Sequence, residues 1–283
     1  MMQHDAVSPL RPIDPVYKFE GTANIWDDWR KLATLVKHLA ARNLAMRYRG
    51  SALGFLWSML NPMLLMAVYT FVFQFVFQAR VPGIPYSAFF LTGVLAWNFV
   101  SGGAMSAAVS LLDGKALINK SAFPRVALPI SAVAASAVNY LMTLPILITF
   151  NFLFGITPTR YFLLFPFAFV LLFLTALAIG LLLAALIPLY RDLQHLVEVL
   201  FVSWFLLTPV LYPMEQVTQN LKGGLSFLYA MNPMVGLINL VHGAFFGQPV
   251  SERIFAISLA GVLALLGLGS WVFNRMSAQV AEG

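Results

Sequence analysis

Six predominantly apolar stretches, each of a length suited to crossing a bilayer, follow one another from about residue 52 onward. Their approximate limits are 53–77, 86–111, 126–153, 161–189, 196–212 and 254–273. A bilayer core of roughly 30 Å needs about 20 helical residues, and only the fifth stretch is short of that length. Hydrophobic residues make up 60% of the chain and charged residues 10%, which excludes an ordinary soluble domain. The sequence therefore predicts an all-α integral membrane protein with six transmembrane helices.

The distribution of positive charge predicts how these helices are oriented. If the N-terminus is cytoplasmic, 13 of the 17 Lys and Arg residues lie on the cytoplasmic side, and Arg80, Arg160, Lys222 and Arg253 lie on the other. Cytoplasmic loops of membrane proteins carry such an excess. We therefore expect both termini in the cytoplasm, and we ascribe the basic composition to membrane topology and not to nucleic-acid binding.

Metal, thiol and acid–base chemistry find little support in the composition. The chain has no cysteine, and His4, His38, His195 and His242 are scattered without metal-ligand spacing. The missing cysteine excludes disulfides and thiolate sites, and the histidine spacing argues against a metal centre. No convincing pair of Asp, Glu or His stands at a predicted membrane surface, so we expect no enzymatic site, metal or cofactor in this chain.

The chain before the first apolar stretch divides into a polar tail, residues 1–23, and a region 24–51 that predicts an amphipathic helix with a basic junction. Asn24 and Asp27 have the spacing of a helix cap and its partner. The apolar residues that recur at helical spacing are Trp26, Trp29, Leu32, Val36, Leu39, Ala40 and Leu44. A Trp-bearing apolar stripe opposite a basic face suits the headgroup region of a membrane. A small helix packed against another protein is the alternative.

A cluster of arginines marks the junction between this helix and the first span. Arg42, Arg47 and Arg49 lie there, with Tyr48 between the last two. An anchor for the cytoplasmic face is the simplest explanation of the charges. Guanidinium groups also pair with phosphates, so the same residues are candidate contacts for an anionic lipid or a lipid-linked substrate.

Four motifs then indicate a family. In chain order they read RYRGSALGFLWSMLNPMLLMAVYTFVF, LINKSAFPRVALPIS, RDLQHLVEVLF with LTPVLYP, and MNPMVGLINLVHGAFFG. Together they resemble the membrane (permease) subunit of type-2 ABC exporters for polysaccharides, the O-antigen, capsule and teichoic-acid export family, and most of all its O-antigen export permeases. The resemblance runs from about residue 30 to the C-terminus, so we treat residues 52–283 as one transmembrane exporter domain.

The resemblance implies partners and a location in the bacterial inner membrane. No G-x-x-x-x-G-K-[ST] motif occurs, so ATP hydrolysis is expected from two copies of a separate nucleotide-binding ATPase subunit. A second copy of this chain is expected, because six helices are too few to enclose a glycan channel. The implied cargo is an undecaprenyl-diphosphate-linked glycan, taken up from among the membrane lipids near Arg42, Arg47, Tyr48 and Arg49.

The resemblance also implies a cytoplasmic coupling helix between the second and third spans, which docks on the ATPase. Its candidate contact residues are Asp113, Lys115, Leu117, Ile118, Lys120 and Phe123. From the residues alone, any basic cytoplasmic loop would look similar. Two short re-entrant gate helices on the periplasmic side are implied within about 214–246, where residues 234–246 are too few to span a bilayer. An ordinary periplasmic loop is the alternative.

Aromatic residues supply candidates for the channel wall. Faces rich in aromatic rings and poor in strong polar groups would let sugar rings slide past without tight binding. Tyr69, Phe73 and Trp97 are our candidates, with packing and lipid contact as the alternative role. Glu198 is the one acidic residue within a predicted span, which disfavours coupling to a proton gradient.

These observations predict the channel-forming subunit of an ATP-driven exporter that moves a lipid-linked, O-antigen-like polysaccharide from the cytoplasm to the periplasm. A type-2 ABC exporter of a small amphiphile or drug is the alternative, because it would share the fold.

Overall fold

The computed structural model describes residues 25–48, 50, 54, 56–78, 81–118, 123–190, 192–220 and 224–276. Within these ranges the chain is helical, and the one strand-like pairing is an isolated bridge between Val81 and Ile84. The polar tail, residues 1–23, and the predicted cap residue Asn24 lie outside the described residues.

The helices differ widely in length. The long ones are α1 (Ile25–Tyr48), α3 (Tyr86–Asp113), α5 (Ala127–Leu153), α6 (Phe165–Leu186) and α11 (Glu252–Met276). The intermediate ones are α2 (Leu56–Thr70), α7 (Leu193–Leu206) and α10 (Pro233–Phe246). The short ones are α4 (Lys115–Ile118), α8 (Met214–Asn220) and α9 (Gly224–Met231). The π-helical η1 (Phe71–Val76) prolongs α2, and the 3₁₀-helical η2 (Arg160–Leu164) leads into α6.

Four of the described helices are long and apolar enough to cross a membrane, namely α3, α5, η2 with α6, and α11. The number rises to five if the bent pair α9 and α10 counts as one span. The segment Leu60–Val76 and helix α7 are apolar but shorter. The prediction of an all-α chain with several membrane-capable helices is thus confirmed, whereas the count of six transmembrane helices stays a prediction. The predicted span limits lie close to the observed helix ends except in the fifth stretch.

That fifth stretch was expected to run to residue 212, but α7 ends at Leu206. Turns follow from Leu207 to Tyr212. Pro209 explains the early end, because proline disfavours helical geometry in the residue before it and offers no backbone N–H donor.

The region expected to hold two short helices, 214–246, contains three: α8, α9 and α10. Helices α9 and α10 meet at an angle of 72°. Asn232 sits at the break, and its Oδ1 accepts a hydrogen bond from the Met234 N–H at 3.0 Å. Pro233 occupies the first turn of α10, where a missing N–H costs nothing. A local cap thus ends one helix and starts the next in a new direction.

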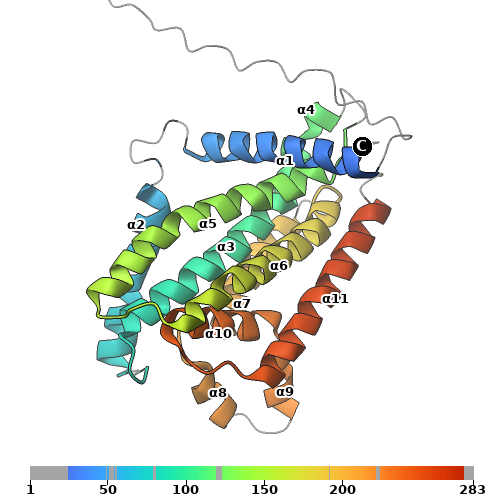
Figure 1. The fold of residues 1–283 in the computed structure, drawn as a ribbon. Coiled ribbons are helices and arrows are strands. Elements are labelled where there is room, and N and C mark those ends of the chain that lie inside the picture. The colour runs from blue at the N-terminus through green and yellow to red at the C-terminus, as the bar shows by residue number, and fades with distance from the viewer. Residues whose placement is uncertain are drawn as a thin grey trace, which may run out of the picture.

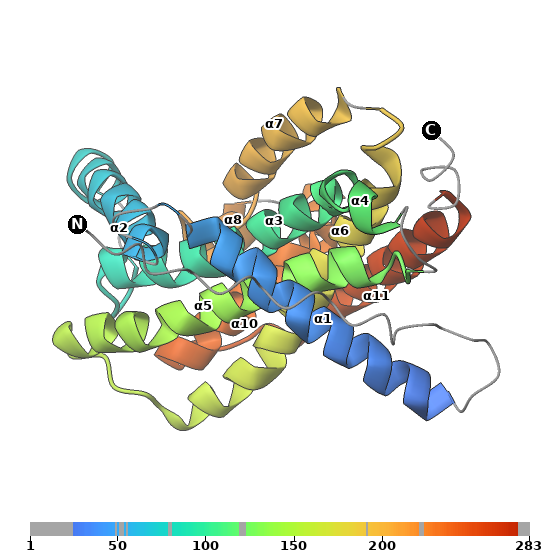
Figure 2. The ribbon, with the colours of Figure 1, turned by 90° about the horizontal axis from the view of Figure 1, so that it is seen from above.

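The two ends of the bundle carry different elements. Helix α1 lies across one end, where α4 is also found, and α8 and α9 lie at the opposite end (Figure 1). Seen from above, α1 crosses over α3 and α5, and α2 and α7 stand on the same side of α3 (Figure 2). Helix α3 is the centre of the bundle, and all of its first twelve residues are buried.

Small residues let the long helices approach closely. A Cβ added at Gly103 of α3 would be 3.5 Å from Ala176 on α6 and from Ser136 on α5. A Cβ added at Gly180 of α6 would be 2.6 Å from the Cβ of Ala107 on α3. Glycine is therefore a packing requirement at Gly180, whereas a Cβ at Gly103 would make ordinary van der Waals contacts. Small residues at such crossings are expected where helices associate in lipid without a hydrophobic driving force.

Gly269 of α11 provides a stability test. Gly269→Ala would place its Cβ against the backbone carbonyl of Ala178 on α6, which has no flexible end that can move aside. We expect a loss of roughly 1–3 kcal/mol, the usual range for overpacking, measured as a lower thermal midpoint of the purified protein in detergent. Gly267→Ala is the matched control, because nothing lies within 4 Å of a Cβ there. Equal midpoints for the two variants would contradict the assigned packing.

Candidate functional site

Two buried leucines hold α1 against the bundle. Leu35 and Leu39 are 3% and 2% exposed and belong to a cluster that includes Leu111 at the end of α3 and Leu128 at the start of α5. Leu35 and Leu39 lie one helical turn apart, so they share one face of α1. The amphipathic helix predicted for this region is present and extends one turn beyond its predicted apolar stripe, to Tyr48.

A cavity of about 330 Å³ lies beneath the C-terminal half of α1, between this helix and the ends of α3 and α5. Its lining residues are Arg42, Asn43, Met46, Arg47, Ser106, Val109, Ser110, Asp113, Gly114, Leu128, Ala132 and Ala135. Two of the four predicted uptake residues, Arg42 and Arg47, therefore share one cavity with Asp113, which was assigned to coupling. We call this space the basic cavity.

Hydrogen bonds to two other helices set the position of Arg47. Its Nη2 donates to Ser106 Oγ of α3 at 3.2 Å and to Ser136 Oγ of α5 at 3.4 Å. Asn43, one turn earlier, donates from Nδ2 to Ser131 Oγ at 3.4 Å. Tyr48 donates from its hydroxyl to Asn139 Oδ1. The last turns of α1 are thus held to α5 by polar contacts.

Arg42 differs from Arg47 in having an unsatisfied donor. Its Nε is buried and has no hydrogen-bond partner. A buried N–H without a partner costs free energy, and more so on a charged group. In the part of the chain that the structure describes, neither Arg42 nor Arg47 forms an ion pair. Two guanidiniums with spare donors around one cavity suit an anion with several oxygens, such as a phosphate. Arg49 lies outside the described residues.

The predicted coupling residues form two groups in the structure. Leu117, Ile118 and Phe123 are half-buried and pack against the cluster that contains Leu35 and Leu39. Asp113 and Lys115 are exposed, and Lys120 lies outside the described residues. The short helix α4 therefore packs its apolar side chains against the cluster that also holds α1, and Lys115 is available to a partner.

A second groove borders α4 on its other flank. It has a volume of about 460 Å³ and is lined by Leu112, Lys115, Ile187, Asp192, Gln194 and His195. It joins the end of α3 to the connection between α6 and α7. Beside it, His195 Nδ1 is 3.8 Å from Glu198 Oε2. Both side chains are exposed, so Glu198 takes part in a local contact at the start of α7.

The three aromatic residues proposed for the channel wall lie on α2, η1 and α3 and are joined through neighbouring rings. The ring of Trp97 is 5.4 Å from that of Trp204 on α7, Tyr69 is 5.0 Å from Phe90, and Phe73 is stacked 6.0 Å from Tyr86. Trp97 is only 5% exposed, because α7 covers it. Tyr69 and Phe73 are half-buried, so part of each ring remains open.

Sequence reasoning missed several polar residues of these sites. Ser131, Ser136 and Asn139 on α5 contact α1, and Trp204 donates from Nε1 to Asn232 Oδ1 at 2.8 Å, which ties α7 to the break between α9 and α10. A signal existed in α5, since these three polar residues fall in the first half of a largely apolar span. Their partners on α1 were not evident from spacing.

Comparison with known proteins identifies the family of this chain. The family model described as ABC-2 type transporter matches residues 34–246. An O-antigen export system permease protein RfbA of Myxococcus xanthus is 35% identical over 250 residues, which cover 88% of this chain and 94% of that protein. An O-antigen export system permease protein RfbA of Klebsiella pneumoniae is 26% identical over 252 residues, which cover 89% and 95%. The chain therefore belongs to the ABC-2 type transporter family of membrane proteins.

Proposed function

We propose that this chain is the channel-forming subunit of an ATP-driven exporter that moves a lipid-linked, O-antigen-like polysaccharide out of the cytoplasm across a bacterial inner membrane. The observation that carries this proposal is the similarity to O-antigen export permeases along almost the whole chain. The basic cavity adds a site whose chemistry suits the diphosphate of such a lipid. Nothing in the comparisons favours a small amphiphile or drug as cargo.

The proposed topology has six spans, with α2 and η1 forming the first and α7 the fifth. The end that carries α1 and α4 faces the cytoplasm. The distribution of basic residues supports this orientation. At the opposite end stand Arg160, at the start of η2, and Arg253, at the start of α11 (Figure 1). At the end with α1 and α4, the basic residues are Arg30, Lys31, Lys37, Arg42 and Arg47 on α1, Lys115 on α4, Arg125 before α5, and Arg275 in the last turn of α11. The bent pair α9 and α10 is then a periplasmic gate, set against the bundle as non-spanning helices at membrane depth must be.

A separate ATPase subunit, in two copies, supplies the energy in this proposal. The exposed part of α4 and the groove beside Lys115 are its docking surface. Because Leu117 and Ile118 rest on the same cluster as α1, movement of α4 would reach α1 and the basic cavity through packed side chains. Glu198 does not support coupling to a proton gradient, because its side chain is exposed beside His195.

A second copy of the chain completes the channel. Helix α7 buries only Val197, and helices α2 and α7 stand on the same side of α3 (Figure 2). In α2, η1 and α7, the large apolar side chains that are at least 55% exposed are Leu56, Leu64, Val68, Phe71, Phe75, Val76, Leu196, Val199 and Val202. Two such faces related by a twofold axis would enclose a path bordered by aromatic rings. Tyr69 and Phe73 lie beside that path.

Deletion of the gene tests the function. We expect long-chain, lipid-linked glycan to accumulate on the cytoplasmic side and to disappear from the cell surface, measured by fractionation of the glycan between the two. Wild-type protein should restore export. Normal surface glycan after deletion would contradict the proposal, and stimulation of the ATPase by small amphiphiles would then favour the alternative cargo.

Cysteine cross-linking tests the proposed contact between copies. The natural chain has no cysteine, so every introduced thiol reports alone. We expect the double variant Val68→Cys and Val202→Cys to form disulfide-linked dimers in membranes under mild oxidation, seen as a doubled mass on a non-reducing gel. Leu263→Cys on α11, where Leu263 is 56% exposed, is the control and should stay monomeric. Cross-linking only through α11 would place the interface elsewhere.

A further inference from the structure

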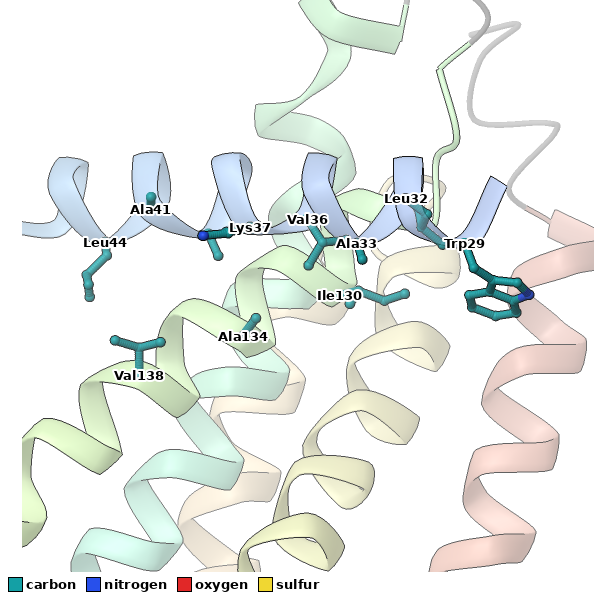
Figure 3. Close-up of a pocket in the computed structure, with 11 residues that line it drawn as sticks. Trp29, Leu32, Ala33, Val36, Lys37, Ala41, Leu44, Ile130, Ala134 and Val138 are labelled. Carbon is teal, nitrogen blue, oxygen red and sulfur yellow. The ribbon is translucent and has the colours of Figure 1, made fainter. Parts of the chain in front are cut away.

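An apolar groove separate from the basic cavity runs between α1 and α5 (Figure 3). Its volume is about 560 Å³. The lining residues are Trp29, Leu32, Ala33, Val36, Lys37, Ala40, Ala41, Leu44, Ile130, Ala134 and Val138. Alanines line both sides of it, namely Ala33 and Ala41 on α1 and Ala134 on α5. Their small side chains leave space that larger ones would fill. We call it the α1–α5 groove.

The groove lies on the opposite flank of α5 from the basic cavity. Ile130, Ala134 and Val138 recur every four residues and so share one face of α5. Leu128, Ala132 and Ala135, which line the basic cavity, lie on another face. The first stripe continues into Met142, which is 48% exposed. The groove is therefore continuous with an apolar surface that descends along the outside of the bundle.

The composition of the groove indicates what can occupy it. All of its lining side chains except that of Lys37 are apolar or aromatic. Water in such a space would lack hydrogen-bond partners. Trp29 at one end of the groove is 61% exposed, and tryptophan is enriched where a membrane surface meets water. Hydrocarbon from the surrounding lipid is the occupant that this lining favours.

Lys37 adds a charge to one edge of this space. Its side chain is exposed, and within the described ranges it has no ion-pair partner. Lysine near the surface of a membrane attracts anionic lipid headgroups. The groove thus combines an apolar trough for a hydrocarbon chain with one cation for a phosphate.

We propose that the α1–α5 groove binds an anionic glycerophospholipid of the membrane. One acyl chain lies between Ala33, Ala41 and Ala134 and continues down α5 past Val138, and the headgroup phosphate pairs with Lys37. The bound lipid fills the space under the outer flank of α1 and holds this helix on α5. This proposal does not depend on the exported cargo, because it requires only that α1 lies at a membrane surface.

Lipid binding to the purified, detergent-solubilised protein tests the proposal. Phosphatidylglycerol is expected to raise the thermal midpoint at lower concentration than phosphatidylcholine, because a ligand that binds only the folded state stabilises it. Ala134→Phe, which fills the groove, should abolish this lipid-dependent rise. Lys37→Gln should weaken phosphatidylglycerol binding about fivefold, the factor expected for one lysine near an anionic surface, and weaken phosphatidylcholine binding less, because that headgroup carries no net charge. Native mass spectrometry should detect co-purified anionic lipid on the wild type and not on Ala134→Phe.

Matched variants and competing ligands make the result decisive. Ala260→Phe, on an exposed part of α11, and Arg30→Gln, on α1 but outside the groove, should behave as wild type. If Ala134→Phe does not purify in folded form, Ala41→Leu narrows the groove from the side of α1 and replaces it. Equal phosphatidylglycerol binding by the wild type and the groove-filling variant would overturn the proposal. Occupation by a polyprenyl diphosphate in place of phosphatidylglycerol would overturn it as well.

Discussion

Export of the lipid-linked glycan is expected to fall on the order of 100-fold when Arg42 and Arg47 are both changed to alanine. Each arginine is expected to contribute a charge-assisted hydrogen bond to the diphosphate, worth about 1.5–3 kcal/mol, and the two effects will not simply add because both residues act on one anion. The unsatisfied Nε of Arg42 is the donor most in need of a partner. The measurement is the rate at which labelled glycan appears outside cells or inside inverted vesicles.

The conservative variant separates charge from geometry. Arg47→Lys keeps the positive charge but loses the planar fork that bonds Ser106 and Ser136, so we expect intermediate export. Arg30→Ala is the control on the same helix, because Arg30 does not line the basic cavity. Thermal midpoints show whether each variant is folded. Wild-type export by a folded Arg42→Ala and Arg47→Ala double variant would remove the basic cavity from the uptake route.

Charge reversal on α4 is the second large effect. Lys115→Glu is expected to weaken binding of the ATPase subunit by on the order of 10- to 100-fold, because a misplaced charge in an interface leaves groups unpaired and repels its former partner. Lys115 is the exposed cation of α4 and borders the groove with Asp192 and His195. Co-purification of the two subunits and glycan-stimulated ATP hydrolysis measure the loss.

The control for this variant is Arg253→Glu. Arg253 is also an exposed cation, but it lies at the start of α11 on the opposite end of the bundle. It should bind the ATPase as the wild type does. If Arg253→Glu and Lys115→Glu weakened binding equally, a change in overall charge would explain both, and α4 would lose its proposed role.

Much of the fold was predictable because lipid restricts the backbone. A span must satisfy its own hydrogen bonds, so length and hydropathy place the helices. The end of α7 was also readable in principle, since Pro209 stands within the predicted span and Pro213 directly after it. The third short helix, α8, was not expected, because residues 214–220 are polar and show no apolar periodicity.

The candidate sites were predictable only in part. The arginine cluster was identified from residue type and position, whereas the coupling role of the α4 loop was implied by the family resemblance. The packing of Leu117 and Ile118 on the cluster that holds α1 and the burial of Trp97 under α7 were not predictable. An apolar side chain in a loop or a span has the same spacing whether it faces a partner, lipid or its own bundle. Which of these it contacts depends on packing.

The amino-acid sequence by itself determined the membrane class, the approximate helix limits, the amphipathic nature of α1 and the separation of basic charge between two ends, because each follows from local hydropathy and charge. Only the tertiary structure decided that Arg47 reaches Ser136, 89 residues later in the chain. It also decided that α1 borders both the basic cavity and the α1–α5 groove, which lie on opposite flanks of α5. The physical reason is that the crossing of α1 over α5 is set by close packing at Leu35, Leu39 and Leu128, and such long-range contacts leave no periodic trace in either segment.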